Sequence, residues 1–425
     1  MDFKKLSNPP VLYRSAPFWS WNDKLDENEL KRQIDEMVDK GWGSFFMHSR
    51  VGLVTGYLSD EWMDLIRKCT AYAKEKGVYA WLYDEDKWPS GFAGGIIPEK
   101  NEAYRGRALI LLPKESITEN DTVLKEVDGE FGKVYVCKRI SPLDSLWFNG
   151  TSYVDLMNPM VTQEFISSTH EAYKKECGDS FGKEIPGIFT DEPCYIMGNQ
   201  YDNFPIVPWS ECLPEFFMNL KGYDICSYVE QLFLDIGDYR KIRFDFYDAA
   251  TRLFLESFSK IYYNWCDKNN LKLTGHYMCE DNMVFQTRWV GAAMPHYEFM
   301  HWPGIDKLER HIEQHVTVKQ LTSVADQLGK ERTLSEVFGC IGQQSSFFHR
   351  KWITDWQAVL GINFVNSHLS LYSMRGERKR DYPANLFIQQ PWWEDERCFA
   401  DYTARVSYAV SQGEREVDID RKSVV

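Results

Sequence analysis

The chain has 425 residues, of which 44% are hydrophobic, and a formal net charge of −14 at pH 7. This length allows two or three domains, or one α/β barrel with insertions. The acidic balance argues against a nucleic-acid partner, because phosphate binding needs a basic face. No apolar run of about 20 residues exists that could span a membrane. The N-terminal MDFKKLSNPP has no apolar segment typical of a signal peptide.

Ten cysteines are scattered along the chain without a C-x-x-C pair, and nine histidines include no H-E-x-x-H. This usage favours reduced thiols in a cytoplasmic protein over a disulfide framework or a structural zinc site. We therefore expect a cytoplasmic location, with no membrane partner and no nucleic-acid partner.

The last six residues, DRKSVV, are what a common sequencing-adapter read-through encodes. One interpretation is that the native chain continues past Ile419 and that further domains are missing after it. The alternative is an ordinary polar C-terminus.

Short apolar runs alternate with helical patterns along the chain. Asp26, three residues before Glu29, and Ser59 are typical helix N-caps. Longer helical patterns cover residues 161–177 and 239–269. Eight segments have the pattern of buried strands: 16–22, 43–50, 78–86, 185–193, 271–280, 295–306, 332–339 and 362–372.

The order of these elements predicts an α/β fold, a (β/α)8 TIM barrel that spans residues 1–425. Between about residues 105 and 155, three strand-like runs follow one another without helices, which predicts a small antiparallel β insertion after the third strand. A doubly wound open sheet is the competing fold. It is disfavoured because no G-x-G-x-x-G follows the first strand and no Walker A lysine motif occurs.

In a (β/α)8 barrel the active site lies at the carboxyl ends of the strands. The residues predicted at those ends are acids, imidazoles and indoles, with few cations. They are Trp19, Trp21, His48, Arg50, Asp84, Glu85, Asp86, Trp88, Asp191, Glu192, His276, Glu280, His301, Trp302, Asp306, Glu336, His368 and Tyr372.

This mixture suits a carbohydrate site. Cleavage of a glycosidic bond needs one carboxylic acid to protonate the leaving oxygen and a second carboxylate as nucleophile or base. Indole and phenol rings give flat platforms for sugar rings, and polar side chains recognise the hydroxyls. Two adjacent acids, Asp191 and Glu192, follow the fourth strand in the run GIFTDEP. Because side chains alternate along a strand, only one of the two can face the mouth as a catalyst, while the other orients it or binds a neighbouring strand.

Each of these signals also has a plain structural explanation. An Asp-Glu pair after a strand is often a helix cap or a solvated turn, and lone histidines are often core residues. Glu336 is harder to explain in this way, because it is a single acid inside the apolar run LSEVFG and a buried acid is costly unless it is paired.

Several motifs, in this order, resemble glycoside hydrolase family 106, which contains α-L-rhamnosidases. They are FWSWNDKL, GWGSFFMHSRVGL, YLSDEWMDLI, YDEDKWPSGFAGG, FTDEP, LSEVFG and RKRDYPANLFIQQPWW. The resemblance covers about residues 17–413. It implies a catalytic (β/α)8 barrel followed by β-rich domains, two catalytic glutamates, inversion at the anomeric carbon and, in some members, calcium near the substrate.

Carried onto this chain, the resemblance makes Glu192 the acid and Glu336 the second carboxylate. Two glutamates at these strand ends also resemble the retaining (β/α)8 glycosidases, so the stereochemistry stays open. The YDEDKW segment is more acidic than the rhamnosidase pattern, which leaves the sugar open.

The prediction for the site is therefore a glycosidase for an oligosaccharide or glycoside, with Glu192 and Glu336 catalytic. No cofactor is required, although calcium is compatible with the resemblance. The predicted substrate-binding residues are Trp21, His48, Arg50, Asp84, Asp86, Trp88, Asp191, His276, Glu280, Trp302, His368 and Tyr372.

Two details refine this prediction. Trp21, Trp88 and Trp302 are expected to line one pocket. Asp191 is expected to keep Glu192 protonated, whereas Arg332 or His368 is expected to keep Glu336 ionised.

Two other functions remain open from the sequence. One is metal-assisted hydrolysis or isomerisation at the barrel mouth with His48, Asp84, His276 and Asp306. The other is a carbohydrate-binding barrel without catalysis. The sequence does not indicate an oligomeric state.

Overall fold

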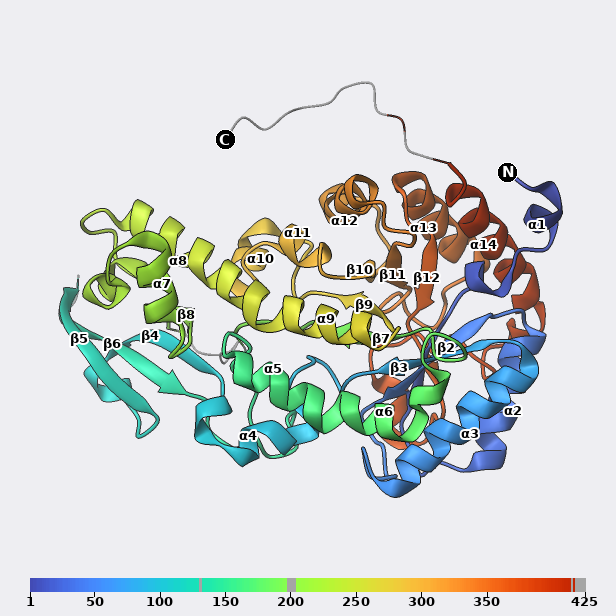
Figure 1. Ribbon diagram of the computed structural model, residues 1–425, viewed down its shortest axis with the longest axis horizontal. Helices are drawn as coiled ribbons and strands as arrows, with labels where there is room; N and C mark the ends of the chain where they lie inside the picture. The colour runs from blue at the N-terminus through green and yellow to red at the C-terminus, as the bar shows by residue number, and fades with distance from the viewer. Residues whose placement is uncertain (130–131, 197–203, 414–415, 417–425) are drawn as a thin grey trace.

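The computed structural model describes residues 1–129, 132–196, 204–413 and 416 (Figure 1). The suspected artefactual tail, residues 420–425, lies outside the described residues. Figure 1 shows two parts, a barrel surrounded by helices and a smaller antiparallel sheet to its left. Among the described helices, none has both the length and the apolar character needed to cross a bilayer.

The barrel is an almost closed parallel sheet, and the predicted (β/α)8 fold is confirmed. In the described part of the chain its strands follow the order β12-β11-β10-β9-β7-β3-β2-β1-β13. They are β1 (Phe18–Trp21), β2 (Ser44–Ser49), β3 (Tyr79–Tyr83), β7 (Gly187–Asp191), β9 (Lys272–His276), β10 (Trp302–Lys307), β11 (Leu334–Val337), β12 (Phe364–Ser367) and β13 (Ser370–Leu371).

The last two strands close the barrel. The segment predicted as one strand, 362–372, is divided into β12, which pairs with β11, and β13, which pairs with β1. The amide of Ala16 also donates to the carbonyl of Val365 at 3.1 Å, across the same seam.

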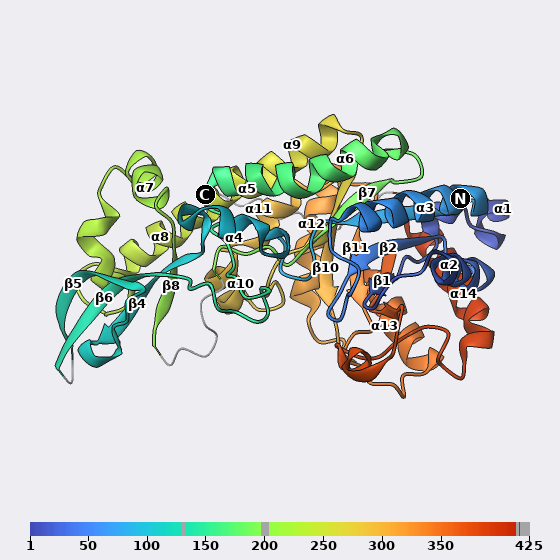
Figure 2. The ribbon, with the colours of Figure 1, turned by 90° about the horizontal axis from the view of Figure 1, so that it is seen from below.

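Helices follow the strands and surround the barrel (Figures 1 and 2). Both predicted caps are confirmed, because the Asp26 carboxylate accepts from the Glu29 amide and the Ser59 hydroxyl accepts from the Trp62 amide. The helices are α1 (Phe3–Ser7), α2 (Glu27–Asp39), α3 (Asp60–Lys76), α4 (Ile96–Lys100), α5 (Pro159–Phe165), α6 (Glu171–Cys177), α7 (Leu213–Lys221), α8 (Tyr239–Phe254), α9 (Lys260–Lys268), α10 (Met283–Trp289), α11 (Ala293–Tyr297), α12 (His315–Leu328), α13 (Phe347–Leu360) and α14 (Glu396–Val410).

The inserted sheet is antiparallel, with the order β5-β6-β4-β8. The predicted insertion supplies β4 (Arg107–Pro113), β5 (Asp121–Gly129) and β6 (Gly132–Ile140). The fourth strand, β8 (Ile206–Trp209), follows β7 in the chain and pairs with β4. The sequence prediction missed it, because its four residues are too few to show an alternating pattern. The chain thus leaves the barrel after β3 and again after β7, and the sheet lies beside the carboxyl ends of those strands (Figure 2).

Alternating side chains divide the core into two layers. One layer lies inside the barrel, and the other packs between the strands and the helices. Among the described strands of the barrel sheet, each one except β9 supplies a residue to the inner layer. The inner layer consists of Ala16, Phe18, Phe46, Trp81, Tyr83, Phe189, Trp302, Leu334, Phe364, Leu369 and Leu371.

The sixth predicted strand begins later than expected. The sequence prediction placed it at residues 295–306, but α11 occupies the first part of this range and β10 begins only at Trp302. Trp302 therefore opens a strand and lies at the amino end of the barrel, where its ring is 5.3 Å from that of Trp81.

Candidate active site

The carboxyl ends of the strands surround a pocket of about 220 Å³. Six of the predicted catalytic and substrate-binding residues line it: Arg50, Trp88, Asp191, Glu192, Glu336 and His368. Asp306, predicted at a strand end, lines it too, and its remaining lining residues are Met278, Leu308 and Tyr382. We call this space the central pocket. The structure thus brings the two predicted catalytic glutamates together.

A second pocket of about 280 Å³ adjoins the central pocket, and the two share Glu192, Asp306 and Leu308 as lining residues. We call it the side pocket. Glu280, Asp281 and Glu309 add carboxylates to its wall. Glu280 was predicted to bind substrate. Its carboxylate is held by the Tyr297 hydroxyl and by the Asp306 amide, at 2.8 Å from the latter.

The adjacent acids Asp191 and Glu192 point in different directions. Asp191 is the last residue of β7 and is 4% exposed, and its carboxylate accepts from the Tyr83 hydroxyl at 2.5 Å. Glu192 has a φ of 49°, which takes its backbone out of the strand conformation, and it lines both pockets. The left-handed backbone therefore aims Glu192 at the mouth while Asp191 faces the barrel interior.

Glu336 extends into the central pocket from β11, two residues beyond the core residue Leu334. It is 4% exposed, and its Oε2 has no hydrogen-bond partner among the described residues. His276 Nδ1 lies 3.7 Å from Oε2, and His368 Nε2 lies 3.7 Å from Oε1. Burial raises the pKa of Glu336 well above its usual value, the nearby Asp306 adds to this, and His276 opposes it.

Burial, and to a smaller extent the neighbouring carboxylates, raises the pKa of three acids around the two pockets. Burial raises the pKa of Glu192 well above its usual value, with further contributions from Asp191, Asp306 and Glu280, while His276 opposes the shift. Burial likewise raises the pKa of Asp306 to about 7 and that of Glu280 to about 7. Protonated carboxyl groups are therefore present at this mouth near neutral pH, as a general acid requires.

Two aromatic rings form another wall of the central pocket. The rings of Trp88 and Tyr382 are 6.2 Å apart, and that of Trp88 lies 5.1 Å from the ring of Trp147 in the insertion. Arg50 lies 5.8 Å from the centre of the Tyr382 ring and is paired with Asp381 at 2.7 Å. Its guanidinium is therefore already neutralised, and we expect it to shape the wall more than to bind an anion.

Tyr382 and Asp381 were missed by the sequence prediction. They lie in a segment after the eighth strand, within the motif RKRDYPANLFIQQPWW. Site residues were predicted only at strand ends, so a residue that reaches the mouth from a loop after the last strand could not be recognised.

Two predicted binding residues face the helices instead of the mouth. Trp21 is fully buried, and its ring packs 5.0 Å from that of Trp62 on α3. The Asp84 carboxylate accepts from the Ser90 hydroxyl at 2.5 Å and from the Tyr262 hydroxyl at 2.9 Å. Both predictions are wrong for one reason: Ser20 and Tyr83, their chain neighbours, face the barrel interior, so the next residues face outward.

Three further predicted binding residues lie near the mouth but line neither pocket: His276, whose ring lies beside Glu336, His48 and Asp86. His48 is buried beneath the central pocket, stacked on Phe18 at 4.8 Å, and neither ring nitrogen has a hydrogen-bond partner among the described residues. Asp86 accepts from the Ser49 hydroxyl at 2.8 Å and from the Asn149 amide at 2.9 Å. Asp86 thus ties the loop after β3 to β2 and to the insertion.

Three more of the residues named in the predictions, Trp302, Arg332 and Tyr372, line neither pocket. Trp302 begins β10, so the prediction that it shares a pocket with Trp88 is wrong. Arg332 packs over Tyr13 and Trp302 at the same amino end, so it cannot keep Glu336 ionised.

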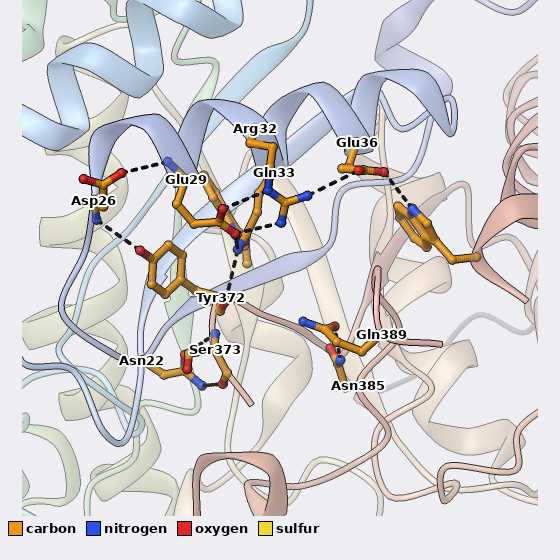
Figure 3. A network of polar contacts seen from close by, with 12 residues as sticks. Asn22, Asp26, Glu29, Arg32, Gln33, Glu36, Tyr372, Ser373, Asn385 and Gln389 are labelled. Carbon is orange, nitrogen blue, oxygen red and sulfur yellow. Dashed lines mark hydrogen bonds and ion pairs between the residues drawn. The ribbon is translucent and has the colours of Figure 1, made fainter. Parts of the chain in front are cut away.

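Tyr372 lies against the start of α2 (Figure 3). Its hydroxyl accepts from the Asp26 amide at 3.1 Å, and its carbonyl accepts from Gln33 at 3.0 Å. It therefore fastens α2 to the closing strand, and its predicted role in substrate binding is wrong.

The predicted metal-binding set is not assembled, because His48 and Asp84 lie apart from His276 and Asp306. Two other sets of three have atoms within 4.8 Å of one another: Asp191, His276 and Glu336, and Glu192, His276 and Asp306. Calcium binds six to eight oxygen atoms, whereas both sets depend on the imidazole of His276. These residues therefore do not fit calcium, and we assign no chemical step to a metal.

Neither a protein-family model nor a curated protein matches this sequence. Among solved structures, the rhamnosidase from Novosphingobium sp. PP1Y superposes with a TM-score of 0.69, at 11% identity, over 97% of this chain and 60% of its own chain. The endo-1,4-β-D-mannanase from Thermotoga petrophila RKU-1 gives a TM-score of 0.47, at 11% identity, over 91% of this chain and 99% of its own.

The present chain thus spans less than two thirds of the rhamnosidase. At this level of identity the similarity shows the fold alone, a TIM barrel that this chain shares with glycoside hydrolases.

Proposed function

We propose that the protein is a glycoside hydrolase of the α-L-rhamnosidase type. The observation that supports this most strongly is the meeting of Glu192 and Glu336 in one pocket of about 220 Å³ at the mouth of the barrel. A pair of carboxyl groups that face one small pocket is the requirement for glycosidic bond cleavage.

In this proposal Glu192 is the general acid. It lies in the wall shared by both pockets, so it can reach the oxygen between a sugar in the central pocket and a leaving group in the side pocket. Its raised pKa keeps it protonated near neutral pH.

Glu336 is the second carboxylate, and it acts on the anomeric carbon directly or through a water molecule. Its place in the central pocket and its unpaired Oε2 support this role. His276 Nδ1, 3.7 Å from Oε2, favours the ionised form, because burial of the imidazole is outweighed by the hydrogen bond to Asp191 and the nearby carboxylates, which raise the pKa of His276 well above its usual value. His368, 3.7 Å from Oε1, does not act in the predicted way, because burial and Arg50 lower its pKa well below the usual value.

The substrate is an oligosaccharide or a glycoside, with Trp88 and Tyr382 as the rings that contact the sugar. Rhamnose is the proposed sugar because of the sequence motifs and the shared fold. We place the enzyme in the cytoplasm, a proposal supported by ten cysteines that are all free.

A screen of 4-nitrophenyl glycosides tests the proposal. We expect release of nitrophenol from the α-L-rhamnoside by the wild-type protein, insensitive to EDTA, and none from a variant with both Glu192→Gln and Glu336→Gln. Sugar binding without release would indicate a carbohydrate-binding barrel instead. Activity that is lost on chelation and restored by a metal would indicate metal-assisted chemistry.

A further inference from the structure

Asp191 lines the central pocket, yet both of its carboxylate oxygens are engaged beneath it. Oδ2 accepts from the Tyr83 hydroxyl at 2.5 Å, and Oδ1 lies 3.1 Å from His276 Nε2. The backbone is fixed as well, because the Asp191 amide donates to the Ser90 hydroxyl at 2.8 Å. Each carboxylate oxygen of Asp191 is therefore already engaged by a protein group, although each keeps a second lone pair.

The other face of His276 meets the second catalytic glutamate. Its Nδ1 lies 3.7 Å from Glu336 Oε2, and neither atom has a hydrogen-bond partner among the described residues. The imidazole is 1% exposed, and its ring packs 5.5 Å from that of Phe189. The ring is thus held between two acids from different strands, one on each nitrogen.

We propose that Asp191 is a positioning residue that acts through His276 on Glu336, and that it does not bind substrate itself. This inference rests on the proposed function, in which Glu336 is the second carboxylate. Asp191 sets the orientation of the imidazole through Nε2, and the imidazole in turn presents Nδ1–H to Oε2 of Glu336.

The charges around His276 support this arrangement. Asp191 faces it from β7, Glu336 from β11 and Asp306 from β10, and Glu192 lies beyond the end of β7. Burial alone would lower the pKa of His276, but the hydrogen bond to Asp191 and the neighbouring carboxylates raise it well above its usual value. The protonated ring has a donor on each nitrogen, as the two contacts require.

The arrangement also explains the pair of acids after β7. Asp191 ends the strand facing inward, and Glu192 turns outward with its positive φ. In this assignment one acid contacts the substrate, and the other orients the group that stabilises the opposite catalytic residue. Neither acid is redundant.

A double-mutant cycle tests the inference, with Asp191→Asn, His276→Gln and both together, assayed on the nitrophenyl glycoside that the wild type cleaves and on an unactivated glycoside. The glutamine can still donate to Asp191 but leaves nothing at the Nδ1 position. We expect each single variant to lose about 10²- to 10³-fold in kcat on both substrates, with KM changed by less than about 3-fold. The kcat of the double variant should lie within about 3-fold of that of the less active single variant, because both substitutions remove the same interaction.

Asp155→Asn is the matched control. Asp155 is another buried acid whose carboxylate accepts from a serine hydroxyl, that of Ser210 at 2.6 Å, but it lines neither pocket and shares no hydrogen-bond partner with Asp191 among the described residues. Its kcat should stay within about 3-fold of the wild-type value. If Asp191→Asn does not fold, His276→Gln alone still decides, since wild-type kcat in that variant overturns the inference.

Several outcomes contradict the proposal in distinguishable ways. Losses that multiply in the double variant mean that Asp191 and His276 act independently. A raised KM with unchanged kcat in Asp191→Asn means that Asp191 binds the sugar directly. A wild-type protein that cleaves no glycoside overturns the proposed function, and this inference with it. An active wild type with an additive cycle overturns the inference alone.

Discussion

The two ends of the barrel interior differ sharply in chemistry, although the same strands build both. At the amino end, the rings of Trp81, Trp302 and Phe364 pack together around Arg332. At the carboxyl end, the interior positions are acids and imidazoles. Three strands show the change within one step of two residues: Phe46 and His48 on β2, Phe189 and Asp191 on β7, and Leu334 and Glu336 on β11.

A residue that packs in the core and a residue of the candidate site are thus only two positions apart on the same strand. Residues two positions apart face the same side of a sheet, so the two members of each pair lie between the same neighbouring strands. Apolar side chains of the inner layer fill the barrel towards its amino end, where a pocket of about 380 Å³ lined by Tyr79, Lys272 and Trp302 among others lies at the strand starts. The carboxyl end opens into the two pockets rich in carboxylates. Substitutions at the two members of a pair should therefore have separable effects, and the predictions below test that separation.

The largest effect is expected on β11. Glu336→Gln should lower kcat by about 10³-fold or more on both activated and unactivated glycosides, because Glu336 is the carboxylate proposed to act at the anomeric carbon. Its melting temperature should be unchanged or higher, since burial already disfavours the ionised form of Glu336 and the amide of Gln has nearly the same shape. Leu334→Ala, two residues earlier, should lose about 2–5 kcal/mol of stability and keep its kcat. Steady-state kinetics and thermal melts of both variants check the contrast. A Glu336→Gln protein with wild-type kcat would sink the assignment.

Glu192→Gln should have the next largest effect, and it should depend on the leaving group. A general acid is needed only when the departing oxygen is a poor leaving group, so the unactivated glycoside should lose about 10²-fold in kcat. The 2,4-dinitrophenyl glycoside should be hydrolysed at close to the wild-type rate. Equal losses on both substrates would mean that the two glutamates exchange roles.

Two tryptophans compare the two ends directly. Trp88→Ala should raise KM by about 10-fold with a smaller change in kcat, because the ring contributes contact area to the sugar and not to the chemical step. Trp302→Ala should leave KM unchanged and cost about 3–5 kcal/mol of stability, because its buried ring packs against those of Trp81 and Phe364 at the amino end of the barrel. Wild-type KM in Trp88→Ala would show that this wall does not contact substrate.

Much of the fold could be predicted from the sequence, because each buried strand is an apolar run bounded by caps and glycines. The helix starts at Asp26 and Ser59 were predicted correctly, because a helix N-cap is a local signal: one side chain accepts a hydrogen bond from a free amide of the first turn. The short strand β8 left too small a pattern to recognise.

The site was predicted less completely, because the side of the sheet to which a side chain points depends on its position in the strand, and this position was not known for every strand. Trp21 and Asp84 were assigned to the mouth from their positions near strand ends, although each is one residue out of phase with the interior. Trp302 was assigned there because the start of β10 was placed too early. Tyr382 reaches the central pocket from a loop after the last strand, and no local pattern in a single sequence reports such a return.

The smallest effect on catalysis is expected at Asp84, which follows β3 but faces the helices. Burial raises the pKa of Asp84 from an ordinary value of 3.8 to about 7, so the folded protein holds its proton more tightly than the unfolded chain does. Between about pH 4 and pH 7 the Asp84 carboxyl is more protonated in the folded state than in the unfolded chain. Its contribution to the free energy of unfolding must therefore fall as the pH rises through this range.

Asp84→Asn removes this titration and leaves the acids of the two pockets in place. The melting temperature of the wild type minus that of the variant should therefore decrease steadily from pH 4 to pH 7 and level off above it. The activity of the variant should follow the wild-type pH profile, since Asp84 lines neither pocket. A difference in melting temperature that does not change with pH would show that Asp84 is ionised in the folded protein, held by Ser90 and Tyr262.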